Sequence, residues 1–327
     1  MERILVCGGA GYIGSHMVRR LLDEGLEVAV FDSFETGHRE AVPAGVEVIE
    51  GDLRNPSDVK RALEPGRFGT VFHFAARIQV GESVTNPVLY YENNVGGTLN
   101  LLAGMVEHGI GRFVFSSSAA VYGTPVGIPI REDHPLAPIN PYGWTKRMVE
   151  QILADLWRGT GLASVSLRYF NACGADPEGR AGESHDPETH LVPNILKRAL
   201  SGSGEPVTIF GDDYPTPDGT CVRDYVHVCD LAEAHLEAME SLEASPGARA
   251  YNLGNGRGFS VMEVLSAAER VLGKKIERRI APRREGDPAF LVADSSLASR
   301  ELGWRPRFTS LEEILRTALD WHRRPLY

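Results

Sequence analysis

The amino-acid sequence predicts an α/β fold in which a doubly wound parallel sheet is joined to a smaller, interleaved C-terminal lobe. In the first half of the chain, short apolar runs alternate with helical patterns, as expected where each parallel strand is followed by a crossover helix. A glycine-rich turn follows the first apolar run, where such sheets bind nucleotides. From about residue 171, proline, glycine and aspartate become frequent and the apolar runs shorten. This change indicates a second lobe built largely from loops.

The strands of the predicted sheet are short apolar runs at residues 3–7, 27–32, 46–50, 70–74, 112–115 and 164–169. The clearest helices between them cover 13–24, 89–108 and 141–158, where apolar residues recur at helical spacing. We therefore assign residues 1–172 to a nucleotide-binding domain. A strand-then-helix pattern at 221–245 indicates that the chain returns to this domain, which leaves 173–220 and 246–327 for the second lobe.

The composition is that of an ordinary globular protein, with 43% hydrophobic and 24% charged residues in a chain of 327. The first residues lead directly into a strand, and no apolar stretch approaches membrane-spanning length, so we expect a cytoplasmic protein without a membrane partner. The net charge of −10 argues against nucleic acid as a partner. The cysteines lack metal-ligand spacing, so free thiols and no metal site are expected at Cys7, Cys173, Cys221 and Cys229.

The turn after the first strand reads Gly8-Gly9-Ala10-Gly11-Tyr12-Ile13-Gly14. Its glycines allow a tight turn, a close approach of backbone N–H groups to a pyrophosphate, and helix packing against the strand. Asp32 ends the second strand, where its carboxylate can bind the adenine-ribose hydroxyls and would repel a 2′-phosphate, so NAD is favoured over NADP. Asp52 follows the third strand and is expected either at the adenine edge or simply in a turn.

The helix expected at 141–158 begins well, because Asn140 is a good N-cap and Pro141 needs no N–H partner. Tyr142 and Lys146 are four residues apart and share one face of this helix. Ionising a tyrosine at neutral pH costs roughly 4 kcal/mol. An ammonium at about 4 Å, with an effective dielectric of about 20, returns energy of that order. The pair is therefore either a phenolate base with its counter-ion or an ordinary buried tyrosine with a solvated lysine.

Ser118 follows the fifth strand, at the sheet edge where open α/β proteins bind ligands. Together, the glycine turn, the serines at 116–118 and Tyr142-x-x-x-Lys146 resemble the extended short-chain dehydrogenase/reductase family, which implies a Rossmann fold. Longer motifs resemble the UDP-glucose (UDP-galactose) 4-epimerases of that family: GGAGYIGSH at 8–16, YYENNVGGTLNLL at 90–102, PYGWTKRMVEQIL at 141–153, IFGDDYPTPDGTCVRDYVHV at 209–228 and APRREGD at 281–287. These motifs extend into the second lobe, so the resemblance implies a substrate class as well as a fold.

The resemblance implies that the chain binds NAD, with Ser118, Tyr142 and Lys146 as catalytic residues. The implied cofactor contacts come mainly from strand ends and the helices that follow them: Gly8, Gly11, Tyr12, Ile13, Gly14, Asp32, Asp52, Leu53, Phe74, Ala75, Ala76, Asn93, Ser116, Tyr142, Lys146 and Tyr169. The implied contacts to a UDP-hexose are Ser118, Tyr142, Asn171, Leu191, Val207, Phe210, Arg223, Tyr225, Arg284, Asp287 and Leu291. Two of these, Arg223 and Arg284, are expected to hold the two phosphates.

Two features of the sequence bear on which sugar is accepted. The position that limits the size of the sugar's 2-substituent in the family aligns with Leu291, or alternatively with Phe290. A leucine lacks the bulk of the tyrosine found in some members, so UDP-N-acetylhexosamines are further candidate substrates. Ala119-Ala120 stands where sugar-nucleotide dehydratases carry Asp-Glu, and a decarboxylase would carry a glutamate in the same loop. Both of these activities are therefore disfavoured.

The implied reaction interconverts UDP-glucose and UDP-galactose. Tyr142, as phenolate, takes the 4-hydroxyl proton while hydride passes from C4 to NAD, and the 4-ketose receives the hydride back on its opposite face. A UDP-glucuronate 4-epimerase and a non-catalytic NAD-sensing regulator remain as alternatives. The resemblance also implies a homodimer formed through the helices at 89–108 and 141–158, which are apolar over more than one face: Leu101, Leu102, Met105, Val106, Trp144, Met148, Ile152 and Leu156.

Overall fold

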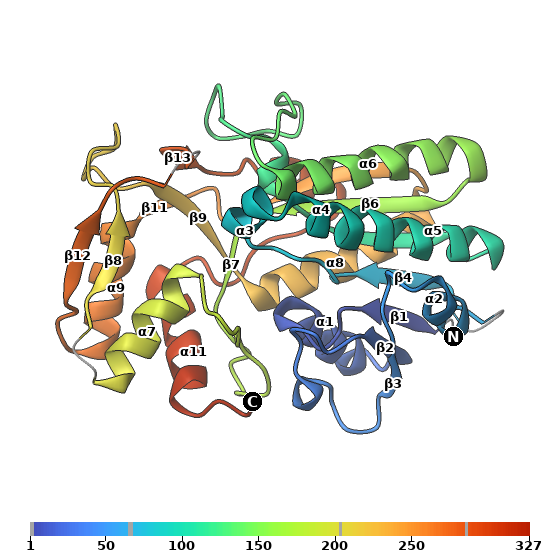
Figure 1. Cartoon of the computed structure of the whole chain (residues 1–327), viewed down its shortest axis with the longest axis horizontal. Coiled ribbons are helices and arrows are strands. Elements are labelled where there is room, and N and C mark those ends of the chain that lie inside the picture. Colours follow the sequence, from blue (N-terminus) through green and yellow to red (C-terminus); the bar gives the residue numbers. More distant parts are fainter. Residues whose placement is uncertain (1–2, 65–67, 203–204, 285–286) are drawn as a thin grey trace.

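The computed structural model describes residues 3–64, 68–202, 205–284 and 287–327 and contains a large and a small lobe (Figure 1). The large lobe is built on a seven-stranded sheet, ordered β10-β6-β5-β4-β1-β2-β3. Its strands are β1 (Ile4–Cys7), β2 (Val28–Asp32), β3 (Glu47–Glu50), β4 (Thr70–His73), β5 (Arg112–Ser118), β6 (Ala163–Tyr169) and β10 (Ala248–Leu253). All neighbouring pairs run parallel. The strand order reverses between β1 and β4, so the predicted doubly wound sheet is confirmed and its ligand-binding crevice is located.

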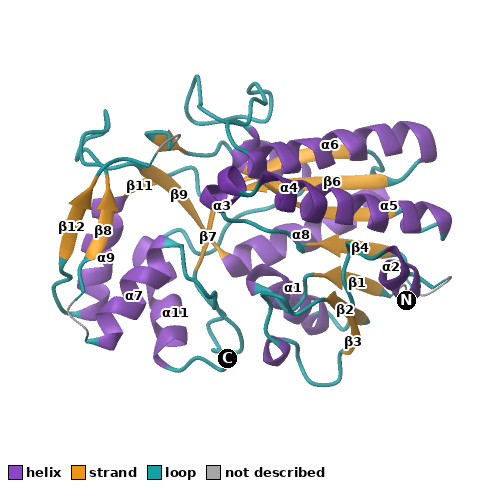
Figure 2. Cartoon of the chain, in the orientation of Figure 1, coloured by secondary structure: helices purple, strands orange, loops and turns teal. Residues whose placement is uncertain are grey.

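Helices cover both faces of this sheet. Helices α1 (Tyr12–Asp23) and α8 (Val228–Ala244) pack on one face, and α2 (Pro56–Ala62), α5 (Gly97–Glu107) and α6 (Pro141–Thr160) on the other (Figure 2). Alternation along β1 divides its side chains between two cores: Ile4 and Val6 pack with α1, whereas Leu5 and Cys7 pack with the opposite helices. The near-continuous apolar strands of the sequence thus reflect burial on both faces.

The helix expected at 89–108 is interrupted. The chain forms α3 (Val80–Thr85) and α4 (Pro87–Tyr90), then a π-helical turn (Tyr91–Gly96), and continues as α5. Such turns widen a helix by one residue and occur often at functional sites. This one contains Asn93 and the buried Asn94.

The small lobe contains two further sheets and three helices. Strand β9 (Val222–His227) pairs with β7 (Asn171–Cys173), β11 (Gly258–Ser260) and β13 (Phe290–Leu291), while β8 (Val207–Phe210) pairs with β12 (Arg278–Ala281). Helices α7 (Leu191–Ser201), α9 (Val261–Leu272) and α11 (Leu311–Arg323) enclose the core of this lobe (Figure 2). In Figure 1 this lobe lies beside the carboxyl ends of the large sheet.

The predicted division into lobes needs two corrections. Residues 248–253, assigned to the second lobe, are β10 and form the outermost strand of the large sheet beside β6. Residues 222–227, expected to return to the first domain, belong instead to the small sheet through β9. The returning segment is α8 followed by β10, because α8 crosses the sheet and delivers the next strand to the free edge of β6.

Among the described residues, we find no helix with both the length and the apolar character that crossing a bilayer requires.

Candidate active site

A cavity of about 390 Å³ lies at the carboxyl ends of the parallel strands and extends between the two lobes. Every residue predicted to contact the cofactor lines this cavity, from Gly8 in the glycine turn to Tyr169 at the end of β6. Of the predicted sugar-nucleotide contacts, those lining it are Ser118, Tyr142, Asn171, Leu191 and Tyr225. The structure therefore places all the predicted cofactor contacts and five of the predicted sugar-nucleotide contacts in one continuous space of the size that binds small molecules.

The glycines of the turn have different structural roles. Gly8 has a φ of +81°, and a Cβ added there would lie 2.5 Å from the backbone nitrogen of Ala75. A Cβ at Gly14 would lie 2.1 Å from the carbonyl oxygen of Gly8. At Gly11 the nearest atom is 3.4 Å away, an ordinary contact, although Gly11 lines the cavity. Gly8 and Gly14 are thus required by the fold, whereas Gly11 keeps open the space that a pyrophosphate needs.

Asp32 connects the end of β2 to the glycine turn. Its Oδ2 accepts a hydrogen bond of 2.9 Å from the N–H of Ala10, and its Oδ1 accepts one of 2.9 Å from the N–H of Phe34. Burial raises the pKa of this carboxyl group, and the backbone donors oppose that effect. The carboxylate lies on the cavity wall, as expected for a ribose ligand.

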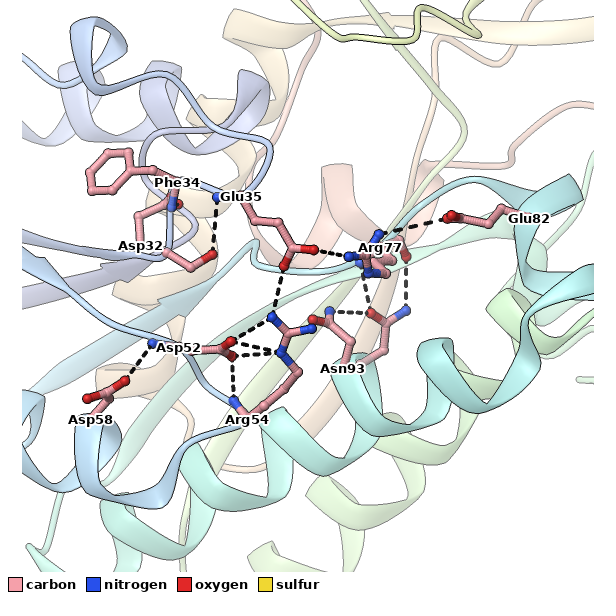
Figure 3. A network of polar contacts seen from close by, with 11 residues as sticks. Asp32, Phe34, Glu35, Asp52, Arg54, Asp58, Arg77, Glu82 and Asn93 are labelled. Atoms are coloured by element: carbon pink, nitrogen blue, oxygen red, sulfur yellow. Dashed lines mark hydrogen bonds and ion pairs between the residues drawn. The ribbon is translucent and has the colours of Figure 1, made fainter.

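Figure 3 shows an ionic network beside Asp32, on the side of the cavity formed by the strand ends of β2, β3 and β4. Asp52 pairs with Arg54 at 2.6 Å, and Arg54 pairs with Glu35 at 2.9 Å. Glu35 also pairs with Arg77, which lies 4.0 Å from Glu82. The hydrogen bonds from Arg54 lower the pKa of Asp52. Because Arg54 and Arg77 both pair with Glu35, Asp32 is the carboxylate on this side that disfavours a ligand with an additional phosphate.

The π-helical turn is hydrogen-bonded to the start of α6 through residues that the sequence did not single out. The buried Asn94 accepts a hydrogen bond from the N–H of Arg77 at 2.8 Å and donates to the hydroxyl of Thr145 at 3.1 Å. Thr145 in turn donates to the carbonyl of Tyr142 at 2.7 Å. Asn93, which lines the cavity, donates to Asn94 at 3.0 Å. The turn therefore holds the first residues of α6 against the cavity.

The structure brings Ser118, Tyr142 and Lys146 together at the inner end of the cavity. Helix α6 begins as predicted, with Asn140 accepting a hydrogen bond of 2.8 Å from the N–H of Gly143. The side chain of Ser118 lies near the hydroxyl of Tyr142, and its polar interaction favours a lower pKa of the phenol. The ammonium of Lys146 donates to the carbonyl of Ser116 at 2.7 Å and lies 5.8 Å from the centre of the Tyr142 ring. A hydroxyl, a phenol and a lysine thus converge from β5 and α6.

The expected effect of Lys146 on the tyrosine needs a correction. Burial raises the pKa of Tyr142 in the ligand-free chain, and the polar interaction with Ser118 is what opposes the rise. Burial also lowers the pKa of Lys146 to about 7, against a smaller opposing effect of Glu150. The sequence argument assumed a fully charged ammonium about 4 Å from the phenol oxygen. Desolvation of both groups outweighs that interaction in the ligand-free cavity.

We expect Lys146 to titrate near pH 7 in the ligand-free protein. The chain has five lysines, so 13Cε-lysine NMR can resolve the resonance that disappears in Lys146→Met. Because the pKa of Lys146 is about 7 in the folded protein and 10.5 for an ordinary lysine, the unfolded chain binds more protons between these values. The stability of the wild type relative to Lys146→Met should therefore rise with pH across that window. A midpoint near 10 for the assigned resonance would contradict this account.

A buried ionic network, formed by Glu150 and Arg168 with Ser117 and Tyr122, connects the elements that carry the catalytic residues. Glu150, one helical turn beyond Lys146, accepts hydrogen bonds from Arg168 at 2.9 and 2.7 Å and from Ser117 at 2.6 Å. Arg168 also donates to the hydroxyl of Tyr122 at 2.9 Å. This network was not predicted, although Glu150 lies on the same face of α6 as Tyr142 and Lys146. It fixes β5, β6 and α6 relative to one another.

Strand register aligns the predicted sugar-nucleotide contacts of the small lobe. Asn171 pairs with Tyr225 between β7 and β9, and Leu291 pairs with Arg223 between β13 and β9. Arg223 and Tyr225 are two residues apart and so share a face of β9. Tyr225 reaches the cavity, while Arg223 lies outside its lining and forms an ion pair with Asp287. One face of β9 therefore carries Tyr225 at the cavity and, two residues earlier, the ion pair of Arg223 with Asp287.

Two other predicted contacts lie together on β8 and the segment after β12, outside the cavity lining. The guanidinium of Arg284 lies 4.1 Å from the centre of the Phe210 ring. The side chain of Val207 points the other way, into the core of the small lobe, where it is 3% exposed. A contact between the Val207 side chain and the sugar nucleotide is therefore incompatible with the structure. Successive side chains of β8 point to opposite faces, and Phe210 is on the face that does not enter the core.

The two candidates for the sugar-size position differ in their surroundings. Leu291 packs against the cluster that contains Ala119 and Tyr122, together with Phe170. That cluster adjoins Ser118 directly in the chain, and Phe170 lines the cavity. Phe290 precedes Leu291 in β13 and so faces the opposite side of the strand. These contacts favour Leu291.

One wall of the cavity was predicted only at Leu191. Residues 182–187 and 189–193, between β7 and the first turns of α7, line it, and among them are Glu183, His185 and His190. The signal for this wall in the sequence is a cluster of ionisable residues, Glu183-x-His185-x-x-Glu188-x-His190, which lies in the loop-rich part of the chain.

The comparisons with known proteins agree with this geometry. Residues 4–254 match the model of the NAD dependent epimerase/dehydratase family. A UDP-glucose 4-epimerase of Halalkalibacterium halodurans is 51% identical over 320 residues, which cover 98% of this chain and 95% of that protein. Among solved structures, the UDP-glucose 4-epimerase from Brucella ovis in complex with NAD is 45% identical, with a TM-score of 0.94 over 98% of both chains. The enzyme from Bifidobacterium longum in complex with NAD+ and UDP is 39% identical, with a TM-score of 0.94 over 99% of this chain and 98% of that one.

Proposed function

Because the chain belongs to the NAD dependent epimerase/dehydratase family, we propose that its cavity holds NAD beside a UDP-hexose, with Tyr142 as the group that handles the proton. The chain is a UDP-glucose 4-epimerase and interconverts UDP-glucose and UDP-galactose in an NAD-dependent reaction. The observation that carries the assignment to this cavity is the meeting of Ser118, Tyr142 and Lys146 at its inner end, next to the glycine turn.

The residues around the nucleotide end fit NAD. Gly11 leaves space beside the N-terminus of α1, where the backbone N–H groups can meet a pyrophosphate. Asp32 suits a ribose with free hydroxyls better than a phosphorylated one. When bound, NAD supplies the hydride acceptor and donor for the sugar's C4 and one positive charge on the nicotinamide.

The chain's own residues handle the proton. Tyr142 lies where it can accept the proton of the sugar 4-hydroxyl, and Ser118 can hold the same oxygen through a second hydrogen bond. The polar interaction with Ser118 favours the phenolate, whereas burial opposes it. Lys146, held by the carbonyl of Ser116, can contribute positive charge from the same face of α6. The proton then returns from Tyr142 to the sugar oxygen on the other face of the carbon.

The small lobe would provide the affinity for the nucleotide. The sugar must turn over between the two hydride transfers, so strong contacts to the hexose would slow the reaction. Arg223 and Arg284 can bind the diphosphate, and Phe210 offers an aromatic surface next to Arg284. The ion pair of Arg223 with Asp287 keeps that guanidinium oriented.

The direct test is to incubate the purified protein, without added cofactor, with UDP-galactose, UDP-N-acetylgalactosamine and UDP-glucuronate, and to resolve the products. The proposal predicts UDP-glucose from UDP-galactose, with bound NAD detected after denaturation of the protein. Conversion of UDP-glucuronate alone would instead identify a uronate epimerase. Bound NAD without conversion of any sugar would identify the regulator.

We also propose that Leu291 permits UDP-N-acetylhexosamines to turn over. Leu291→Tyr should reduce kcat/KM for UDP-N-acetylgalactosamine by at least tenfold and change that for UDP-galactose less than threefold, because the added ring would occupy the space of the 2-substituent. The matched variant Phe290→Tyr should leave the ratio unchanged, since residue 290 faces the other side of β13. An equal effect of Leu291→Tyr on both sugars would refute the assignment.

We further propose a homodimer, with a revised interface. Leu101, Leu102 and Met105 were expected at the interface, but all three are buried in the core under α5. Ile152 and Leu156 also pack against this core. The other expected residues, Val106, Trp144 and Met148, are exposed, and so are Val80, Val84, Val88 and Leu99 on α3, α4 and α5. Trp144 and Met148 are four residues apart, and the helices α5 and α6 run side by side on the outer face (Figure 2).

The double variant Trp144→Glu/Met148→Glu should sediment as a monomer at concentrations where the wild type sediments as a dimer. Burying two carboxylates in an apolar interface is unfavourable. Val126→Glu is the control, because Val126 is 83% exposed and belongs to a loop outside both helices. A dimeric double variant, or a monomeric wild type, would contradict the interface.

A further inference from the structure

Four side chains in the wall between β7 and α7 form a compact group outside the catalytic set. Glu183, His185, Glu188 and His190, here called the Glu–His cluster, each offer one ligand atom, and these atoms all lie within 4.8 Å of one another. All four come from eight consecutive residues. Glu183 is buried and the other three are partly exposed, and of these His185 and His190 line the cavity. The ligand atoms of the four residues therefore lie close together, and solvent can reach them.

The distances within the cluster are close to those of a tetrahedral metal site. Bonds of 2.0–2.1 Å to zinc place two tetrahedral donors about 3.3 Å apart. His185 Nδ1 lies 3.4 Å from Glu183 Oε1 and 3.7 Å from Glu188 Oε1. His190 Nδ1 lies 4.0 Å from Glu188 Oε1 and is hydrogen-bonded to Glu183. Small rotations of the side chains would bring the four donors to one ion.

The chemistry of the donors selects the type of ion. Imidazole nitrogen suits zinc, copper, nickel and iron, whereas magnesium and calcium prefer sites made of oxygen alone. Two imidazoles with two carboxylates form a neutral set for a divalent ion. Lys197 pairs with the other oxygen of Glu188 at 3.4 Å, which leaves Oε1 facing the two histidines. That oxygen also accepts the N–H groups of Thr189 and His190, so a metal bound there would take the place of one of these hydrogen bonds.

The cluster is supported by neighbouring elements. The indole of Trp321 on α11 donates to the carbonyl of Glu183 at 3.1 Å. The amide of Asn194 on α7 donates to the carbonyl of Glu188 at 3.1 Å. The ring of His185 packs edge-on against Tyr12, with centroids 6.3 Å apart, at the start of α1. The cluster thus lies where the glycine turn of the large lobe meets α7 and α11 of the small lobe.

We propose that the Glu–His cluster binds one divalent transition-metal ion of the zinc type, which fixes the conformation of this wall of the cavity. The ion would be structural, because four protein ligands fill a tetrahedral shell and leave no open position for a substrate. It would hold His185 against Tyr12 and so fix the side of the cavity that faces the cofactor turn. The catalytic residues Ser118, Tyr142 and Lys146 do not belong to this cluster.

The test uses cobalt as a spectroscopic probe of the full chain. Protein stripped with EDTA and dialysed is titrated with Co2+, and the visible d–d absorption is followed. We expect about one equivalent of Co2+ with the intense bands of a tetrahedral site, which Zn2+ then displaces. His185→Asn and Glu188→Gln should each weaken Co2+ binding at least tenfold, because loss of a ligand costs no less than loss of its supporting contacts. His134→Asn, a histidine in another loop, should bind like the wild type.

A second measurement needs no variant. Zn2+ should raise the Tm of the stripped wild type in a concentration-dependent way, because binding to the folded state stabilises it. Absence of any Co2+ bands and of a Zn2+-dependent Tm shift in the wild type would overturn the proposal. So would Co2+ affinities of His185→Asn and Glu188→Gln equal to that of His134→Asn, since binding would then occur elsewhere on the surface.

Discussion

Replacing Tyr142 by phenylalanine should lower kcat for UDP-galactose by about 10²–10⁴-fold, the usual contribution of a general base. The affinity for UDP-galactose should change less than threefold. The side chain is 9% exposed, so its ring is packed and a phenylalanine fills nearly the same volume. What is lost is the hydroxyl that lies near Ser118 and is available to the sugar.

The measurement combines turnover kinetics with calorimetric binding of UDP-galactose to the NAD-containing variant. Tyr214→Phe is the matched control, because it removes a buried hydroxyl that has no hydrogen-bond partner among the described residues. We expect the control to turn over at the wild-type rate. If Tyr142→Phe retained more than a tenth of wild-type kcat, Tyr142 could not be the base.

The same substitution at two glycines of the cofactor turn should have opposite effects on folding and binding. Gly14→Ala should unfold the chain or lower its Tm severely, since its Cβ would lie 2.1 Å from the backbone oxygen of Gly8. Gly11→Ala should fold with a Tm near that of the wild type, because its nearest neighbour is 3.4 Å away. The added methyl group points into the cavity, so NAD affinity should fall at least tenfold.

Thermal unfolding of the NAD-free proteins, followed by NAD titration of the folded ones, separates the two effects. The pair serves as its own control, since the chemical change is identical. A stable Gly14→Ala variant would show that the turn can rearrange. Unchanged NAD affinity in Gly11→Ala would show that the pyrophosphate does not lie at this turn.

Sequence periodicity was sufficient for the large sheet because its strands are buried on both faces and separated by amphipathic helices. The boundaries of β1 to β6 differ by at most three residues from those expected. Periodicity did not assign β10 to the correct sheet, because its six residues resemble any short strand of the small lobe. Only the path of α8 across the sheet decides which edge receives that strand.

The candidate site was predictable where a local motif carries the chemistry. The glycine turn and the Tyr142–Lys146 spacing are short-range patterns, and both lead to the cavity. The network of Glu150 and Arg168 was not predictable, because it depends on the register of β5 and β6 and on their packing against α6. The pKa values of Tyr142 and Lys146 depend on burial, which spacing alone does not reveal. The wall at Glu183 was overlooked because the search for metal ligands considered only cysteines.

The fate of the hydrogen on C4 tests the central claim most directly. UDP-glucose deuterated at C4 is incubated with the protein in ordinary water, and the UDP-galactose formed is analysed by mass spectrometry and NMR. Transfer to NAD and back within one cavity predicts that the product keeps its deuterium at C4. Replacement of that deuterium by hydrogen from the solvent would contradict this account, because the carbon would then have exchanged a proton rather than a hydride.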